Sequence, residues 1–178
     1  MLEEGYDLPP LMLTPDEIEA AVLGAQWVST QADPALARAA QDLIAKIAAA
    51  VPDRLRPYVL EPATRMPPRS PVATPDGLDM AHTRAWIHAG RKIRLSYADE
   101  GGRGSDRIVW PVTVAYFHTV RLLVAWCELR RDFRHFRTDR VTSADFLDER
   151  YPDRPAVLRD RWLEDMRRRW QARGAAEN

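Results

Sequence analysis

The distribution of proline divides this chain into two parts that cannot share one continuous secondary structure. Seven of its 14 prolines lie between Pro52 and Pro75. Proline lacks a backbone N–H and fixes its own φ, so this density excludes helix interiors and central strands. We therefore predict an extended connector here, with a helical segment before it and a strand-rich segment after it.

Two helix-start signals precede the connector. The residues Thr14 to Glu17 supply an N-cap, a proline at the first helical position and the carboxylate of a capping box. Asp33-Pro34 repeats the cap and the proline. Apolar residues follow both signals at helical spacing, which predicts helices over residues 15–30 and 34–50. The short linker between them implies an antiparallel helical hairpin.

Beyond the connector the period of the hydrophobic pattern changes from 3.6 to 2. A helix is predicted over residues 78–88, with Gly90 as its C-terminal cap. Five short strands follow, over residues 91–97, 107–114, 120–129, 133–137 and 141–146. Sequential, mostly antiparallel strands within about 55 residues predict a small five-stranded β-barrel rather than a sandwich.

A last helix is predicted over residues 155–173. Its apolar residues Leu158, Trp162, Met166 and Trp170 are four apart, and such a stripe needs a surface to bury against. That surface is the barrel, the helical hairpin or a second subunit. The fold class is therefore α+β, in four expected segments: a helical region at 1–60, a proline-rich connector at 61–77, the barrel at 78–150 and the C-terminal helix at 151–178.

Composition describes a globular chain. Of its 178 residues, 46% are hydrophobic and 29% are charged, which is typical of soluble domains. No apolar run approaches the roughly 20 residues that cross a bilayer, so we expect no membrane partner. The N-terminus has no secretory signal pattern. The single cysteine, Cys127, cannot form an internal disulfide, which favours the cytoplasm.

A formal net charge of zero hides an asymmetry. Residues 1–80 carry 6 Lys+Arg against 12 Asp+Glu, whereas residues 81–178 carry 20 against 14. Halves of opposite charge imply different partners, an anion for the second half. Because the chain has only two lysines, Lys46 and Lys92, a GC-rich genome explains the arginine number. The placement of the arginines is therefore more informative than their count.

Arginine recurs every third residue in the segment Arg131 to Arg140 (RDFRHFRTDR), interleaved with aromatic rings. Guanidinium forks hold phosphate or carboxylate, and aromatic faces stack on bases. The pattern favours binding of a planar anion. The alternative, with equal weight, is that these arginines face solvent and pair with Asp132, Asp139 or Glu128. Strict alternation puts Arg134 and Arg137 on opposite faces, so a single basic face requires a bulge or a strand end near Arg137.

Signals for catalysis are missing from the sequence. The four histidines form neither an i,i+4 pair nor an HxH motif, and Cys127 lies in an apolar strand that predicts a buried thiol. There is no GxSxG, no Walker loop and no dinucleotide fingerprint, and the glycine-rich run Gly101 to Gly104 joins two strands. We expect no enzyme activity, no metal and no cofactor.

The stretch from Lys92 to Val141 closely resembles the WYL domain of bacterial WYL-domain transcriptional regulators. The matching elements, in order, are Tyr97, Ser105, Arg107, Pro111, Ala125, Trp126, Cys127 and the run from Arg134 to Arg140. The tripeptide that names the family is replaced by Arg121-Leu122-Leu123. The segment from Tyr6 to Glu17, the helical hairpin and the connector resemble the linker of these regulators, so the similarity spans residues 5–150.

The resemblance implies an Sm-like or SH3-like small barrel that senses an effector. Nucleotides and single-stranded nucleic acid are the leading effector class, and the signal passes through the geometry of a homodimer. The ligand surface of the family maps to Tyr97, Arg107, Arg137 and Arg140, with His118 and Arg134 as weaker additions. Tyr97 would stack or donate a hydrogen bond, and the arginines would hold phosphates.

These observations favour a ligand-sensing regulatory module of a bacterial transcriptional regulator. In such regulators a winged helix-turn-helix precedes this segment, and the chain begins at Met1, about where the wing would end. Met1 is then an internal methionine of a longer protein, the start of an excised domain or the start of a headless variant. Operator DNA is expected as a partner only in a longer form. Two alternatives stay open: a stand-alone module for single-stranded nucleic acid, and a structural dimerisation domain.

Overall fold

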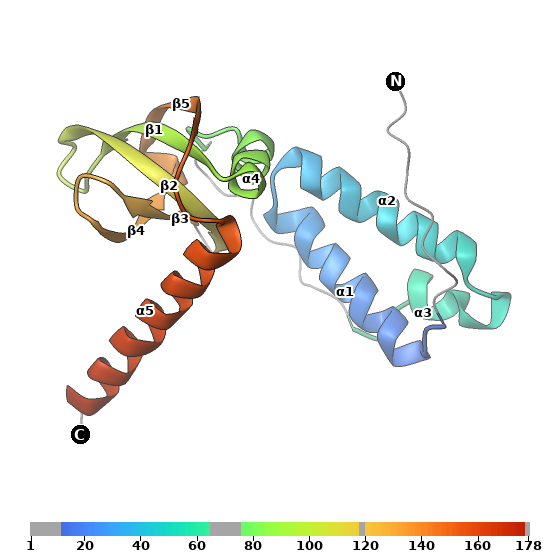
Figure 1. The fold of residues 1–178 in the computed structure, drawn as a ribbon. Coiled ribbons are helices and arrows are strands. Elements are labelled where there is room, and N and C mark those ends of the chain that lie inside the picture. Colours follow the sequence, from blue (N-terminus) through green and yellow to red (C-terminus); the bar gives the residue numbers. More distant parts are fainter. Residues whose placement is uncertain (1–11, 65–75, 118–119, 177–178) are drawn as a thin grey trace. The chain divides into compact units, whose positions relative to one another are not determined.

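The computed structural model describes residues 12–64, 76–117 and 120–176 (Figure 1). The chain separates into two compact units, residues 1–71 and residues 72–178. In the described residues the first unit contains one hydrophobic cluster and the second contains two. In the described part of the chain, no helix combines the length and the apolar character that a membrane span requires.

The first unit is a helical hairpin, as the cap signals predict. Helix α1 (Pro15–Gln31) begins with the capping box: the backbone N–H of Thr14 donates to the Glu17 carboxylate at 2.8 Å, and the Glu17 N–H donates to the Thr14 hydroxyl at 3.3 Å. Helix α2 (Pro34–Ala50) begins at Asp33, whose carboxylate accepts two backbone N–H bonds. These bonds satisfy backbone N–H groups that have no partner within the first turn of a helix. Both predicted helices are therefore confirmed.

The chain after Pro52 differs from the extended segment that its prolines predict. A 3-10 turn, η1 (Asp53–Leu55), leads into the short helix α3 (Arg56–Leu60), where Val59 packs with Ile18 and Val22 of α1. Pro57 occupies the first turn of α3, where a missing N–H removes no helical bond. Tertiary burial of Val59 therefore overrides the local preference. Residues 65–75, most of the predicted connector, lie outside the described residues.

The second unit combines two helices with a sheet. Its elements are α4 (Met80–Ala89), β1 (Arg91–Ala98), β2 (Gly104–Tyr116), β3 (Arg121–Cys127), β4 (Asp132–Arg137), the 3-10 turn η2 (Thr138–Arg140), β5 (Val141–Arg150) and α5 (Pro155–Ala176). Gly90 ends α4 at a φ of 67°, the left-handed conformation that favours glycine, so the predicted cap is confirmed.

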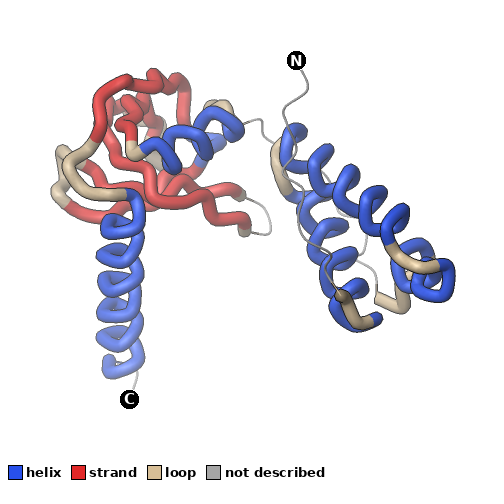
Figure 2. Tube along the Cα trace, turned by 45° about the vertical axis from the view of Figure 1, so that its right-hand side comes forward, coloured by secondary structure: helices blue, strands red, loops and turns tan. Residues whose placement is uncertain are grey.

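All five strands pair antiparallel in the order β4-β3-β2-β1-β5, shown as red strands in Figure 2. This confirms an α+β fold with a five-stranded antiparallel sheet. Within the described strands β4 and β5 do not pair, so the sheet is open. The closed Sm-like or SH3-like barrel is not confirmed. Strand β5 also runs further than predicted, because it follows β1 as far as the pair Arg91 and Arg150.

Both faces of the sheet are covered. One face carries the larger core, in which Ile93, Leu95 and Leu123 have no exposed surface. The intervening residues of β3 face the other side, where Val124 packs with Tyr151 and Leu158. The members of the first core are Leu78, Met80, Ile93, Leu95, Val109, Leu123, Ala125, Cys127, Phe136 and Val141. The alternation of side chains along these strands therefore places residues in two buried cores, one on each face of the sheet, rather than on one buried and one solvated face.

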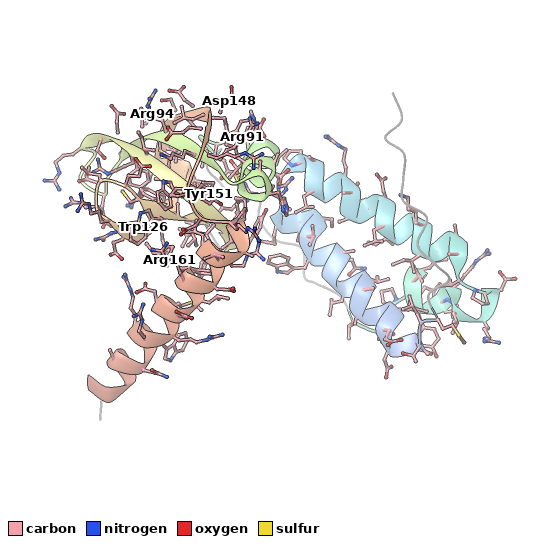
Figure 3. All side chains as sticks on the ribbon, in the orientation of Figure 1. Arg91, Arg94, Trp126, Asp148, Tyr151 and Arg161 are labelled. Atoms are coloured by element: carbon pink, nitrogen blue, oxygen red, sulfur yellow. The ribbon has the colours of Figure 1, made fainter. Side chains whose placement is uncertain are left out.

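The apolar stripe of α5 buries only its first half. Leu158 has no exposed surface and Trp162 packs against the second core, so the sheet covers this half of the stripe. The guanidinium of Arg161 adds a cation–π contact, 5.2 Å from the centre of the Trp126 ring (Figure 3). Further along, Met166 is 39% exposed and Trp170 is 77% exposed.

Candidate anion-binding site

Strand pairing gathers three of the predicted ligand residues on one face of the sheet. Arg107 of β2 pairs with Leu95, and Arg134 of β4 pairs with Ala125. Residues that pair directly in antiparallel strands project from the same face. Because Leu95 and Ala125 belong to the first core, both arginines continue that face where the apolar residues end. Tyr97, two residues after Leu95, projects from the same face.

A depression of about 510 Å³ lies at this end of the core face. Its lining contains the partly buried Tyr97, the buried Phe136 and four arginines that come from two β-hairpins. The lining residues are Tyr97, Asp99, Arg103, Gly104, Ser105, Arg107, Cys127, Arg130, Arg134, His135 and Phe136. This combination can bind an anion through guanidinium forks and a planar group through the tyrosine ring.

The ring of Tyr97 is held by the core. Its centre lies 5.3 Å from that of Phe136, and the two rings are nearly perpendicular, at 84°. Phe136 is 5% exposed, whereas Tyr97 is only partly buried. An edge-to-face contact with a buried ring limits the orientations that Tyr97 can take. Its free surface is therefore presented to the depression at little further entropic cost.

Among the described residues, two of the four arginines in the lining, Arg107 and Arg130, have no acidic partner, whereas the other two do. Arg103 bonds to Asp99 with a nitrogen–oxygen distance of 2.9 Å, and Arg134 lies 3.5 Å from Asp132. Within the described residues, no carboxylate lies within 4.0 Å of Arg107 or Arg130, and Arg107 donates to the backbone carbonyl of Asp106 at 2.9 Å. The potential in the depression is therefore positive, which favours an anionic ligand.

Arg137 and Arg140 do not line the depression. Arg137 is the last residue of β4 and Arg140 the last residue of η2, the turn that follows it. The Arg137 guanidinium makes a bidentate contact with Asp139, at 3.0 and 2.7 Å. Arg140 lies 3.8 Å from Glu100, in the turn that follows Tyr97. Arg137 therefore pairs with one of the acids that the alternative interpretation named, whereas the partner of Arg140, Glu100, was not among them. Arg134 combines such an acid partner, Asp132, with a place in the lining. His118 lies outside the described residues.

The pairing of Arg137 with Asp139 predicts a dependence of stability on pH. The hydrogen bonds from Arg137 hold the pKa of the Asp139 carboxyl below its usual value. A lowered pKa in the folded state stabilises the fold above the unfolded pKa, and the contribution disappears as pH falls through the folded pKa. We expect Asp139→Asn to lower the Tm at neutral pH and to match wild type in strong acid. Thermal unfolding across this range tests it, and a constant difference at every pH would contradict the assignment.

Arg103 and Arg130 belong to the lining, although neither is among the ligand residues predicted from the sequence. Arg103 lies in the turn between β1 and β2, and Arg130 in the turn between β3 and β4. In four sequential antiparallel strands these two turns lie at the same end of the sheet. That order of strands, combined with one arginine in each turn, is the signal that could have found them.

Comparison with known proteins identifies the fold around this site. The model of the WYL domain family matches residues 80–146, from the start of α4 into β5. This match confirms the resemblance seen in the sequence, and the matched range contains all residues that line the depression.

One similar solved structure is the proteasome accessory factor B/C (PafBC) of Arthrobacter aurescens. It is 24% identical, the match covers 81% of this chain and 20% of that chain, and the TM-score is 0.43. The chain therefore spans about a fifth of the length of that relative. The comparison with curated protein sequences gave no match.

Proposed function

We propose that this WYL domain is the ligand-sensing module of a bacterial transcriptional regulator and binds an anionic effector, a nucleotide or a single-stranded nucleic acid. It binds this effector without transforming it. The observation that carries the proposal is the grouping of Tyr97, Arg107 and Arg134 around one positive depression. A buried single thiol, Cys127, accords with a reducing cytoplasm.

The arginines and Tyr97 contribute to binding in different ways in this proposal. Arg107 and Arg130 have no acidic partner in the described structure, so their forks are available to phosphate oxygens without breaking an ion pair. Arg134 must break its 3.5 Å contact with Asp132 before its guanidinium can bind the ligand. Tyr97 presents a ring on which a base can stack. Most of the affinity then comes from charge, and binding weakens as salt rises.

Binding is coupled to regulation in this proposal through a homodimer. An effector that prefers one arrangement of two copies shifts the population toward it. The exposed half of the α5 stripe, with Met166 and Trp170, favours the second candidate function, a structural dimerisation domain. The two candidates differ at the arginines, because a purely structural domain keeps its behaviour when they are removed.

Fluorescence anisotropy with a labelled single-stranded oligothymidylate tests the proposal. We expect Arg107→Ala and Arg134→Ala each to weaken binding at low salt by about tenfold, since a charged hydrogen bond contributes roughly 1.5–3 kcal/mol. Each should also reduce the slope of log affinity against log salt by about one.

Arg94→Ala is the matched control for these two variants. Arg94, which is labelled in Figure 3, precedes Leu95 and therefore projects from the opposite face of β1. It lies 3.6 Å from Asp145. It removes the same charge from the same sheet, so we expect a change within about twofold. Equal losses in all three variants would indicate unspecific attraction. Absence of wild-type binding at low salt would reject a nucleic-acid effector.

A further inference from the structure

A buried polar cluster joins the segment before α4 to the turn η2. The carboxylate of Asp76 accepts a hydrogen bond from the Thr138 hydroxyl and forms an ion pair with Arg121 of β3. The Asp76 and Arg121 side chains are 11% and 13% exposed, and Thr138 is 1% exposed. The neighbouring Gly77 N–H donates to the Thr138 carbonyl at 3.0 Å. Thr138 is thus held through both its side chain and its backbone.

The cluster supplies what η2 lacks locally. A 3-10 turn of three residues has poor internal hydrogen bonds, and no side chain caps this one. Asp76 and Thr138 are 62 residues apart in sequence, so their bond is a tertiary restraint. A carboxylate and a hydroxyl that are removed from water form strong hydrogen bonds when every polar group of the network has a partner. The position of η2 is therefore set largely by residues 76 and 77.

The residues on either side of Thr138 are those that flank the anion site. Arg137 precedes it and is bonded to Asp139, which follows it. Arg140 ends the turn, near Glu100. Val141, the residue that follows Arg140, pairs with Tyr97 of the depression in the sheet, so η2 leads directly into the strand beside Tyr97. A shift of Thr138 would redirect both guanidinium groups relative to the depression.

We propose that Asp76 is a positioning residue for the anion site, which holds η2 so that Arg137 and Arg140 face an effector bound at the depression. This inference rests on the proposed function for its ligand, but the placement of Arg137 can be tested without one. The same contact connects the site with the segment that leads into α4. An effector that draws Arg137 away from Asp139 therefore acts on Thr138 and, through it, on Asp76.

The first test is a set of double substitutions, measured by anisotropy with labelled oligothymidylate at low salt. Asp76→Asn keeps the size of the side chain and removes its charge. We expect it to weaken binding by about fivefold, in the range of coupling between residues of one network. In an Arg137→Ala/Arg140→Ala background the same substitution should have no further effect, whereas in an Arg107→Ala background it should keep its full effect. Equal effects in both backgrounds would overturn the inference.

The second test needs no ligand. Proton exchange of the Arg137 Nε–H, which bonds to Asp139 at 3.0 Å, is measured by NMR in wild type and in Asp76→Asn. We expect exchange to accelerate severalfold, while the Arg103 Nε–H, bonded to Asp99 at 2.9 Å, stays unchanged as the internal control. An unchanged Arg137 signal would overturn the inference even if the effector proposal holds.

A second variant is used if the first one fails to fold. If Asp76→Asn does not fold, Thr138→Val removes only the hydroxyl and is tested in the same way, with the same expectations. If wild type binds no oligothymidylate, the effector proposal fails, and the NMR comparison still decides whether Asp76 positions Arg137. The two proposals can therefore fail separately.

Discussion

Gly77→Ala should lower the free energy of unfolding of the second unit, residues 72–178, by about 3 kcal/mol, near the upper end for overpacking. A Cβ at this position would overlap the carbonyl oxygen of Val141, which is a backbone atom at the start of β5. A flexible side chain could move aside, but a strand cannot do so without disturbing its pairing. Relief therefore requires the Gly77–Thr138 hydrogen bond or the first residues of β5 to shift.

Gly104→Ala is the matched control for this prediction. A Cβ at Gly104 would meet nothing within 4 Å, and its φ lies outside the left-handed region. We expect a change of about 0.5 kcal/mol or less. Urea unfolding followed by tryptophan fluorescence measures both variants, because five of the six tryptophans lie in residues 72–178. Equal midpoints for Gly77→Ala and Gly104→Ala would contradict the close approach.

Leu158→Ala should cost about 2–5 kcal/mol, the usual range for removing a fully buried leucine. Leu158 has no exposed surface and contacts Val124 and Tyr151 in the second core. It is the deepest anchor of α5, so its truncation leaves a cavity between helix and sheet. We expect hydrogen exchange in the first turns of α5 to accelerate together with the fall in stability.

Met166→Ala provides the comparison on the same helix. Met166 lies two turns beyond Leu158 in the same stripe but is 39% exposed. A partly exposed side chain loses less buried area, and we expect a cost of about 1 kcal/mol or less. A penalty for Leu158→Ala no larger than that for Met166→Ala, measured by urea unfolding, would show that α5 is not anchored to the sheet through Leu158.

The anchoring of α5 also bears on the candidate site. Arg169 of α5 donates to the Asp132 carboxylate at 2.5 Å, and the same carboxylate lies 3.5 Å from Arg134 in the lining of the depression. Asp132 is thus shared between the terminal helix and an arginine that lines the depression. If Arg134 leaves Asp132 to bind an effector, Asp132 still has Arg169 as its partner. Effector binding then leaves no unpaired carboxylate.

The helices and strands could be predicted because their signals are local. The capping box of Thr14 and Glu17, the left-handed cap at Gly90 and the alternation of Ile93 and Leu95 all act within a few residues. Each gives a backbone preference or a buried face that tertiary packing preserved. The predicted position of Arg137 at a strand end is also found, since β4 ends there and η2 follows.

Other features depend on partners that lie far away in the sequence. Val59 stabilises α3 through its contact with α1, and Asp76 meets Thr138 across 62 residues. The register of β1, β2 and β4 decides that Arg107 and Arg134 share the face of Tyr97. It equally decides that Arg137 is paired with Asp139 beside the depression rather than within its lining.

The sequence by itself therefore determined most of the helices and strands and the α+β class, because propensity, capping and periodicity are properties of short segments. Only the tertiary structure decided that the sheet is open, that two turns contribute Arg103 and Arg130, and which guanidinium groups lack acidic partners in its described part. The physical reason is that burial and ion pairing depend on distances between side chains, which the chain sets only when it folds.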